Sequence, residues 1–169
     1  MGGRRKELLP TVSGETIRDR WVRLFAEADV PWVLVGGGEP GALVDEGAGA
    51  GPLGGLAALL ARAGGERAVS VAGDMPFVSP ALIDRLLDAP PAVVVAPRHG
   101  PRWEPFFAIW DAGQALPLVR ARIAAGALSL QGVFDSLDAK ELPLSEEEAR
   151  LLFDWDTPED VSQSAPERP

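Results

Sequence analysis

The 169-residue sequence contains no cysteine and only one histidine. Without cysteine, the chain has no disulfide bonds, thiolate metal sites or cysteine nucleophiles. The single His99 excludes a two-histidine metal site, and the Pro/Gly-rich stretch around it, PRHGPR, indicates a surface loop. These two absences remove thiol chemistry and paired-histidine metal binding from the functions open to this protein.

Long apolar runs are also missing. No stretch approaches the roughly 20 apolar residues that a membrane span needs, and the opening MGGRRK does not lead into an apolar signal core. We therefore expect a cytoplasmic protein without a membrane partner. The net charge of −9 argues against a protein that grips a nucleic-acid backbone, so no nucleic-acid partner is expected. An acidic protein can still bind a nucleotide where a few cations and a metal gather.

The length of the chain is that of one domain with a substantial core. We predict a single domain over residues 1–162 and a flexible tail over residues 163–169, because the end of the chain is rich in Ser and Pro.

Short apolar runs alternate along this domain with segments whose apolar residues recur at helical spacing. Strands are expected at residues 32–35, 43–45, 68–72, 92–96, 106–110 and 140–144. Helices are expected at about residues 15–28, 56–63, 79–88, 117–125, 129–137 and 145–152. This alternation predicts an α/β fold, a doubly wound and mostly parallel sheet with helices on both faces.

The stretch Arg67–Phe77, RAVSVAGDMPF, is the centre of this pattern. Its uncharged run over residues 68–72 is typical of a strand buried on both faces, and the carboxylate of Asp74 follows it. Ligands bind beyond the carboxyl ends of parallel strands, where a lone carboxylate suits Mg²⁺ that holds phosphates. The alternative is that Asp74 is a helix cap or a turn residue. Ser79-Pro80 is the better cap for the next helix, which leaves Asp74 free for other work.

A glycine-rich loop after Asp45 leads into the helix expected at residues 56–63. Its last part, GPLGG over residues 51–55, offers free backbone N–H groups and the positive end of a helix dipole, which can bind a phosphate. The alternative is a tight loop without a ligand. Carboxylates stand at or near the ends of three strand-like runs, namely Asp45, Asp74 and the pair Asp154 and Asp156. Parallel strands bring their carboxyl ends to one edge of the sheet. The sequence therefore predicts that these carboxylates converge there and mark a functional site.

Several motifs resemble those of one known family, in the same order and spacing. MGGRRKELL resembles the end of the N-terminal signature LAGGxSxRMGGxDKxLL, and GAGPLGGL resembles the GPLxG segment. GDMPF resembles the CDMPF metal motif, WEPFFAIW the xPxxALY strand, and FDWDTPEDV the closing FxNxNTPEDL. On these motifs the chain is identified as a member of the molybdenum cofactor guanylyltransferases, MobA-like nucleotidyltransferases with a Rossmann-like fold.

The resemblance implies an enzyme of molybdenum cofactor biosynthesis that depends on Mg²⁺. It would transfer GMP from GTP to molybdopterin and release pyrophosphate. A molybdopterin phosphate oxygen would attack the α-phosphorus in line, without a covalent enzyme intermediate, so positioning and electrostatics would do most of the work. Other proteins of molybdenum cofactor biosynthesis are candidate partners.

The resemblance also implies which residues form the site. Carried over by position, Lys6 would contact the GTP phosphates and Asp74 would hold Mg²⁺, so these two are the expected catalytic residues. The guanosine side would be bound by Asp45 and by the turn of Gly51, Pro52 and Leu53.

The chain departs from the family pattern at several positions. The family's first strand and LAGG loop, which donate backbone N–H groups to the phosphates, would precede Met1. Either the chain begins within a longer protein, or this form lacks a complete phosphate cradle. Further departures are Arg5 for Asp, Gly36 or Gly37 for Asn, Glu104 for a polar or basic residue, and Asp154 and Asp156 for two asparagines.

Two alternatives to guanylyl transfer therefore stay open. One is a catalytically impaired or N-terminally truncated module that binds nucleotide, and the other is a cytidylyltransferase for the same cofactor. GPLxG together with DMP fits guanylyl transfer better, because the cytidylyl rival shows DQP and a different loop.

Overall fold

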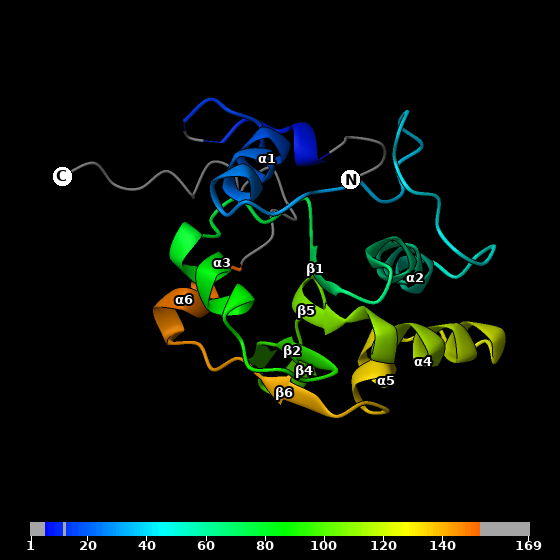
Figure 1. The fold of residues 1–169 in the computed structure, drawn as a ribbon. Helices are drawn as coiled ribbons and strands as arrows, with labels where there is room; N and C mark the ends of the chain where they lie inside the picture. The colour runs from blue at the N-terminus through cyan, green and yellow to red at the C-terminus, as the bar shows by residue number, and fades with distance from the viewer. Residues whose placement is uncertain (1–5, 12, 153–169) are drawn as a thin grey trace. The chain divides into compact units, whose positions relative to one another are not determined.

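The computed structural model describes residues 6–11 and 13–152 (Figure 1). The chain forms two compact units built from segments that are far apart in the sequence. The first consists of Met1–Trp32, Ala72–Asp84 and Ser145–Pro169, and the second of Val33–Val71 and Arg85–Leu144. A single domain over residues 1–162 stays a prediction, and the tail predicted over residues 163–169 lies outside the described residues.

The second unit contains a four-stranded sheet in the order β1-β5-β2-β6 (Figure 1). Its strands are β1 (Arg67–Val71), β2 (Val94–Ala96), β5 (Phe107–Asp111) and β6 (Ala139–Glu141). β2 and β6 are parallel, whereas β5 is antiparallel to both of its neighbours, β1 and β2. Three strands therefore run in one direction and β5 runs in the other, which confirms the α/β class and adds a reversal that was not expected. Two short strands, β3 (Arg98–His99) and β4 (Arg102–Trp103), form a separate antiparallel pair.

The helices of this unit are α2 (Pro52–Ala63), α4 (Ala112–Ala124) and α5 (Leu130–Phe134). Their apolar faces join alternate strand residues in one core, which includes Leu53, Val94, Trp110, Val119 and Phe134. The residues that alternate with them on the strands, such as Val95, Phe107 and Ile109, are buried as well. β2 and β5 are thus buried on both faces, as their uninterrupted apolar runs predict. In β1, buried residues alternate with half-buried ones, and β6 is mostly exposed, so the burial of residues 68–72 on both faces is only partly confirmed.

The helix expected at residues 117–125 begins at Ala112, so the predicted start of this helix is wrong. The side chain of Asp111 accepts a hydrogen bond from the backbone N–H of Gln114, so the helix starts at Ala112. Pro117 lies inside it. The cap at Asp111 thus starts the helix five residues before Pro117.

The strands expected at residues 32–35 and 43–45 do not form. A single parallel bridge joins Val35 to Leu43, and only residues 36–42 separate the two. Parallel pairing needs a connection of about a dozen residues or more, so this bridge has no room to extend into a ladder. The side chains of Trp32 and Val44, which remain 49% and 86% exposed, confirm that these runs are not buried strands.

The described part of the first unit is helical. It holds the 3-10 helix η1 (Lys6–Leu8), α1 (Ile17–Glu27), α6 (Glu146–Arg150) and most of α3 (Pro80–Leu87). Ile17, Trp21 and Leu24 of α1 are buried at helical spacing, as the sequence pattern predicts. Among the helices of the described residues, none is long and apolar enough to cross a membrane.

A buried serine joins β1 to β5 and to the loop before β5. Ser70 Oγ donates a hydrogen bond to the carbonyl of Pro105 at 2.7 Å and accepts one from Trp110 Nε1 at 2.9 Å. Ser70 and Trp110 are 5% and 0% exposed, so water cannot readily replace the hydrogen bond between them. The hydroxyl therefore satisfies two groups inside the core at once.

Replacing Ser70 with alanine is expected to lower the free energy of unfolding by about 1.5 kcal/mol, since it leaves buried polar groups unpaired. For a chain of this size that corresponds to a fall in melting temperature of roughly 3–6 °C. The exposed Ser13 provides the control, because Ser13→Ala is expected to stay within about 0.5 kcal/mol. Calorimetry of both variants checks the difference, and equal melting temperatures would contradict it.

Candidate functional site

Asp74 lies in a turn just past the carboxyl end of β1. The strand ends at Val71, residues Gly73 and Asp74 form the turn, and Asp74 is partly exposed. The next helix, α3, is capped by Ser79, whose Oγ accepts a hydrogen bond from the Leu82 N–H at 3.3 Å. Asp74 is therefore not the cap of α3. The remaining alternative to a metal ligand is that Asp74 serves only as a turn residue.

The 3-10 helix that begins at Lys6 lies against this turn. A Cβ atom built on Gly73 would stand 3.2 Å from the Cβ of Glu7, which is closer than most side chains approach one another. Glycine at position 73 is what permits this approach. The structure thus brings the segment of Lys6 and the segment of Asp74 together within the first unit.

Asp45 belongs to the second unit and has an exposed side chain. Its Oδ1 atom lies 3.5 Å from where a Cβ would stand on Gly36 and 3.4 Å from where one would stand on Gly55. The carboxylate therefore covers two glycines, one in the loop after Val35 and one in the first turn of α2. Gly36 has a φ of 74°, a left-handed conformation that favours glycine over the expected asparagine.

The turn of Gly51, Pro52 and Leu53 forms the start of α2, as predicted. Gly51 is the N-cap with a φ of 57°, Pro52 takes the first helical position, and no side chain caps the helix. The side chain of Leu53 is fully buried in the core. Only the backbone of Leu53 is thus available to a ligand, whereas its side chain anchors the turn to the sheet.

An ion pair that the sequence did not reveal holds the loop after Asp45. Arg120 on α4 donates two hydrogen bonds to Glu46, from Nε to Oε2 at 2.8 Å and from Nη2 to Oε1 at 2.7 Å. These hydrogen bonds and the charge of Arg120 lower the pKa of Glu46, because they stabilise the ionised carboxylate. No local motif could have found the pair, because its partners lie far apart in the sequence and meet only in the fold.

The predicted site residues fall into two groups. Lys6 and Asp74 belong to the first unit, whereas Asp45 and the turn at residues 51–53 belong to the second. Asp154 and Asp156 lie outside the described residues. Within residues 6–11 and 13–152, no three His, Cys, Asp or Glu side chains cluster as a metal site made of protein ligands alone would require. Mg²⁺ commonly uses only one or two carboxylates plus substrate phosphates, so Asp74 with a bound nucleotide still fits this ion.

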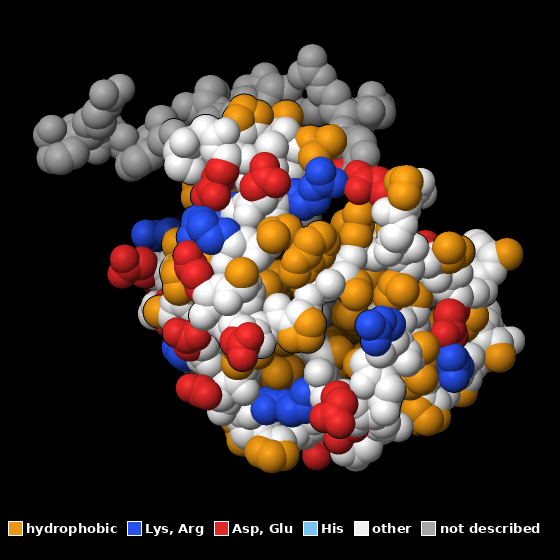
Figure 2. Space-filling model, turned by 45° about the horizontal axis from the view of Figure 1, so that its top comes forward, with side chains coloured by type: hydrophobic (Ala, Val, Ile, Leu, Met, Phe, Trp, Pro, Cys, Tyr) orange, Lys and Arg blue, Asp and Glu red, His pale blue; other side chains and the backbone are white. Residues whose placement is uncertain are grey.

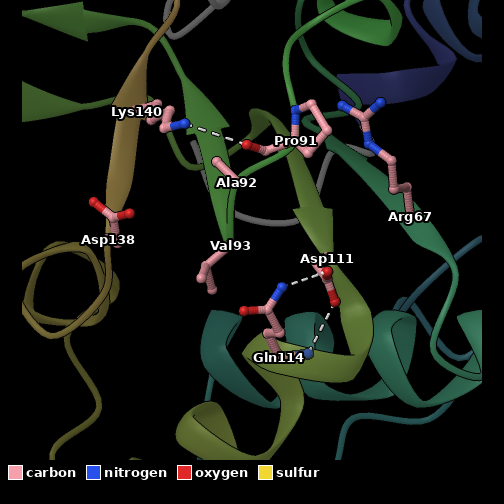
Figure 3. Close-up of a pocket in the computed structure, with 8 residues that line it drawn as sticks. All are labelled: Arg67, Pro91, Ala92, Val93, Asp111, Gln114, Asp138 and Lys140. Atoms are coloured by element: carbon pink, nitrogen blue, oxygen red, sulfur yellow. Dashed lines mark hydrogen bonds between the residues drawn. The ribbon is translucent and has the colours of Figure 1, made fainter.

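A pocket of about 280 Å³ opens at the other end of β1, around Arg67 (Figure 3). Most of its polar side chains already serve the fold. Arg67 and Lys140 donate hydrogen bonds to backbone carbonyls, and Asp111 caps α4 through Gln114. The hydrogen bonds from Gln114 also lower the pKa of Asp111. This pocket is therefore not the predicted site, which lies at the carboxyl end of the strand.

Charge is spread over the face of the molecule that Figure 2 shows. Lysine and arginine side chains are interspersed there with aspartate and glutamate side chains.

The chain matches the profile of the MobA-like NTP transferase domain over residues 1–140. A "probable molybdenum cofactor guanylyltransferase" of Opitutus terrae is 36% identical over 166 residues, which cover 87% of this chain and 80% of that protein. A protein of the same name from Pelotomaculum thermopropionicum is 40% identical over 67 residues, which cover 39% of this chain and 33% of that protein.

Two solved structures share the fold. Molybdopterin-guanine dinucleotide biosynthesis protein A from Archaeoglobus fulgidus has a TM-score of 0.64 at 17% identity, over 95% of this chain and 89% of its own. The 2-C-methyl-D-erythritol 4-phosphate cytidylyltransferase of Thermus thermophilus also has a TM-score of 0.64, at 19% identity, over 94% of this chain and 90% of its own. At these identities the likeness concerns the fold alone.

Proposed function

The chain belongs to the MobA-like NTP transferase family, and we propose that it transfers GMP from GTP to molybdopterin and releases pyrophosphate. The observation that carries this proposal is the contact between the helix of Lys6 and the turn of Asp74. Two segments that would serve the phosphates are thereby in contact within one compact unit. The names of the Opitutus terrae and Pelotomaculum thermopropionicum relatives support guanosine as the transferred nucleoside.

On the phosphate side, Lys6 would place a positive charge beside the triphosphate as negative charge passes to the leaving pyrophosphate. Asp74 would hold Mg²⁺, and its partly exposed carboxylate in a turn leaves room for the substrate oxygens that complete the coordination. When bound, the metal supplies charge neutralisation and orients the phosphates. The attacking oxygen would come from molybdopterin, so no side chain has to act as a covalent nucleophile.

On the nucleoside side, Asp45 would select the base. Its carboxylate is exposed and lies over Gly36 and Gly55, which carry no side chain of their own. A carboxylate accepts two adjacent N–H donors well, and guanine presents such a pair at N1 and N2. Adenine and cytosine each present a single amino group on the corresponding edge. The turn at residues 51–53 would pack beside the nucleoside through its backbone.

GTP with Mg²⁺ is therefore expected to raise the melting temperature more than CTP or ATP does. At a concentration a hundred times its dissociation constant, a ligand adds about 2.7 kcal/mol, or roughly 5–10 °C for a chain of this size. Differential scanning fluorimetry with the three nucleotides checks the order. In the Asp45→Asn variant the preference for GTP should shrink, because the amide replaces one acceptor with a donor.

The same measurements separate the alternatives. A larger shift with CTP would assign the cytidylyl role, which the shared fold of the Thermus thermophilus cytidylyltransferase accommodates. A shift with GTP, but no pyrophosphate release when GTP and molybdopterin are supplied together, would assign a binding module without turnover. Equal shifts for all three nucleotides would defeat the guanine assignment.

A further inference from the structure

The loop over residues 45–50 is held between α2 and α4. We infer that Arg120 on α4 is a positioning residue for nucleotide binding, because it fixes this loop and with it Asp45. The inference rests on the proposed function in that Asp45 is taken to bind the guanine base. It goes beyond that function, since Arg120 acts on the nucleotide only through the loop.

The loop touches α4 at two points one helical turn apart. Arg120 binds both carboxylate oxygens of Glu46, the neighbour of Asp45, at 2.7 and 2.8 Å. A Cβ built on Gly47 would lie only 2.9 Å from the side chain of Ile123, so the loop backbone packs directly on that residue. Residues three apart share one face of a helix, so Arg120 and Ile123 form a single docking face for the loop.

The other side of the loop is fixed by α2. The Glu46 N–H donates a hydrogen bond to the carbonyl of Gly54 at 3.0 Å. A Cβ on Gly54 would lie 2.5 Å from the carbonyl oxygen of Glu46, so the two backbones are in close contact. The backbone of Glu46 is thus held by α2 and its side chain by α4, which leaves little freedom to Asp45 next to it.

Without Arg120, the loop keeps its contacts with Ile123 and with the backbone of α2, but the side chain of Glu46 loses its two hydrogen bonds to α4. Gly47 and Gly49 both adopt left-handed φ values, 78° and 76°, and glycine has the largest conformational freedom to lose. Bidentate pairing of an arginine with a carboxylate restrains direction as well as distance. Arg120 and Glu46 are 53% and 31% exposed, so the pair contributes little to global stability. Its effect is therefore expected in the loop rather than in the melting temperature.

Hydrogen exchange of the loop amides tests the anchor without any ligand. Arg120→Ala is expected to speed exchange over residues 45–50 several-fold while exchange in β1 and β5 stays unchanged. The matched control is Arg23→Ala, which removes an arginine paired with Glu15 and Glu27 in the first unit. Loop exchange that is no faster in Arg120→Ala than in Arg23→Ala would overturn the inference, whether or not nucleotide binds.

Calorimetric titration tests the consequence for the nucleotide. With Mg²⁺ present, Arg120→Ala is expected to weaken GTP binding about fivefold, in line with an exposed ion pair. Binding of inorganic tripolyphosphate should not change, since it would use Lys6 and Asp74 only. A general loss of structure would weaken both ligands. The charge exchange Glu46→Arg with Arg120→Glu should restore part of the GTP affinity.

The outcomes distinguish this inference from the proposed function. If the unaltered protein binds GTP and Arg120→Ala binds it equally well, the inference is wrong and the proposed function stands. If the unaltered protein binds no nucleotide, the proposed function and the role of Arg120 in it both fail, while hydrogen exchange still shows whether Arg120 anchors the loop. Equal weakening of GTP and tripolyphosphate would also overturn the positioning role.

Discussion

Replacing Asp74 with asparagine is expected to lower Mg²⁺-dependent turnover at least about a hundredfold and to leave the melting temperature unchanged. Asparagine is nearly isosteric with aspartate, so the substitution tests charge rather than packing. A metal held through one carboxylate loses several kcal/mol of charge stabilisation when that carboxylate becomes neutral, at about 1.4 kcal/mol per factor of ten. GTP affinity with Mg²⁺ should fall with the activity, whereas GTP affinity in EDTA should not.

The control for this variant is Asp138→Asn, which neutralises an exposed aspartate in the pocket at the other end of the sheet. It changes the net charge by the same amount and should alter neither turnover nor metal-dependent affinity. If Asp74 serves only as a turn residue, asparagine will replace it there at little cost. Unaltered Mg²⁺-dependent affinity in Asp74→Asn would therefore remove Asp74 from the site and most of the case for an enzyme.

Replacing Gly54 with alanine is expected to destabilise the protein by roughly 2–3 kcal/mol. The added methyl group would stand 2.5 Å from the backbone carbonyl of Glu46, which cannot turn away as a flexible side chain could. It would also approach Ala50 and Asp45 within 3.2 and 3.3 Å. The clash places this substitution at the upper end for an overpacked site and outweighs the helix propensity that alanine gains. GTP affinity should fall as well, because the loop that presents Asp45 is displaced.

Gly113 provides a matched control, since it also lies in the first turn of a helix. A Cβ there would meet its nearest atom, an oxygen of Asp111, at an ordinary 3.4 Å. Gly113→Ala is therefore expected to be neutral or to stabilise by up to about 1 kcal/mol. Chemical denaturation of the two variants gives the comparison, and a Gly54→Ala protein as stable as Gly113→Ala would show that the loop adapts freely.

Much of the fold could be predicted from the sequence because short apolar runs and glycine or proline boundaries are local signals. The strand at residues 68–72, its turn and the cap at Ser79 were all predicted, and β1 and α3 confirm them. The direction of β5 could not be predicted, since an apolar run reads the same whichever way the strand points. The run at residues 32–35 was misjudged because apolar character predicts burial only when a partner strand is within reach.

In the candidate site, too, local motifs could be predicted from the sequence, whereas tertiary contacts could not. Short motifs predict Asp74, Asp45 and the turn at residues 51–53 as site residues. Family membership confirms the resemblance that those motifs carry, and the roles of the residues stay predictions. The contact of Asp45 with Gly36 and the pairing of Glu46 with Arg120 depend on tertiary packing. Neither residue of the pair belongs to a motif, so only the folded chain connects them to the site.

The position of β5 in the sheet also determines when β1 and β2 can pair during synthesis on the ribosome. β1 and β2 do not pair with each other, and both pair with β5, which is made after them. From Arg67 to its partner Asp111, translation at about 5–20 residues per second takes roughly 2–9 s. Throughout that interval the nascent β1 has no β5 to pair with, and exposed apolar strand segments are the ones that aggregate. Slow codons between residues 72 and 106 would lengthen the time between synthesis of β1 and synthesis of β5. Recoding that stretch is therefore expected to change the yield of folded protein without changing the amino-acid sequence.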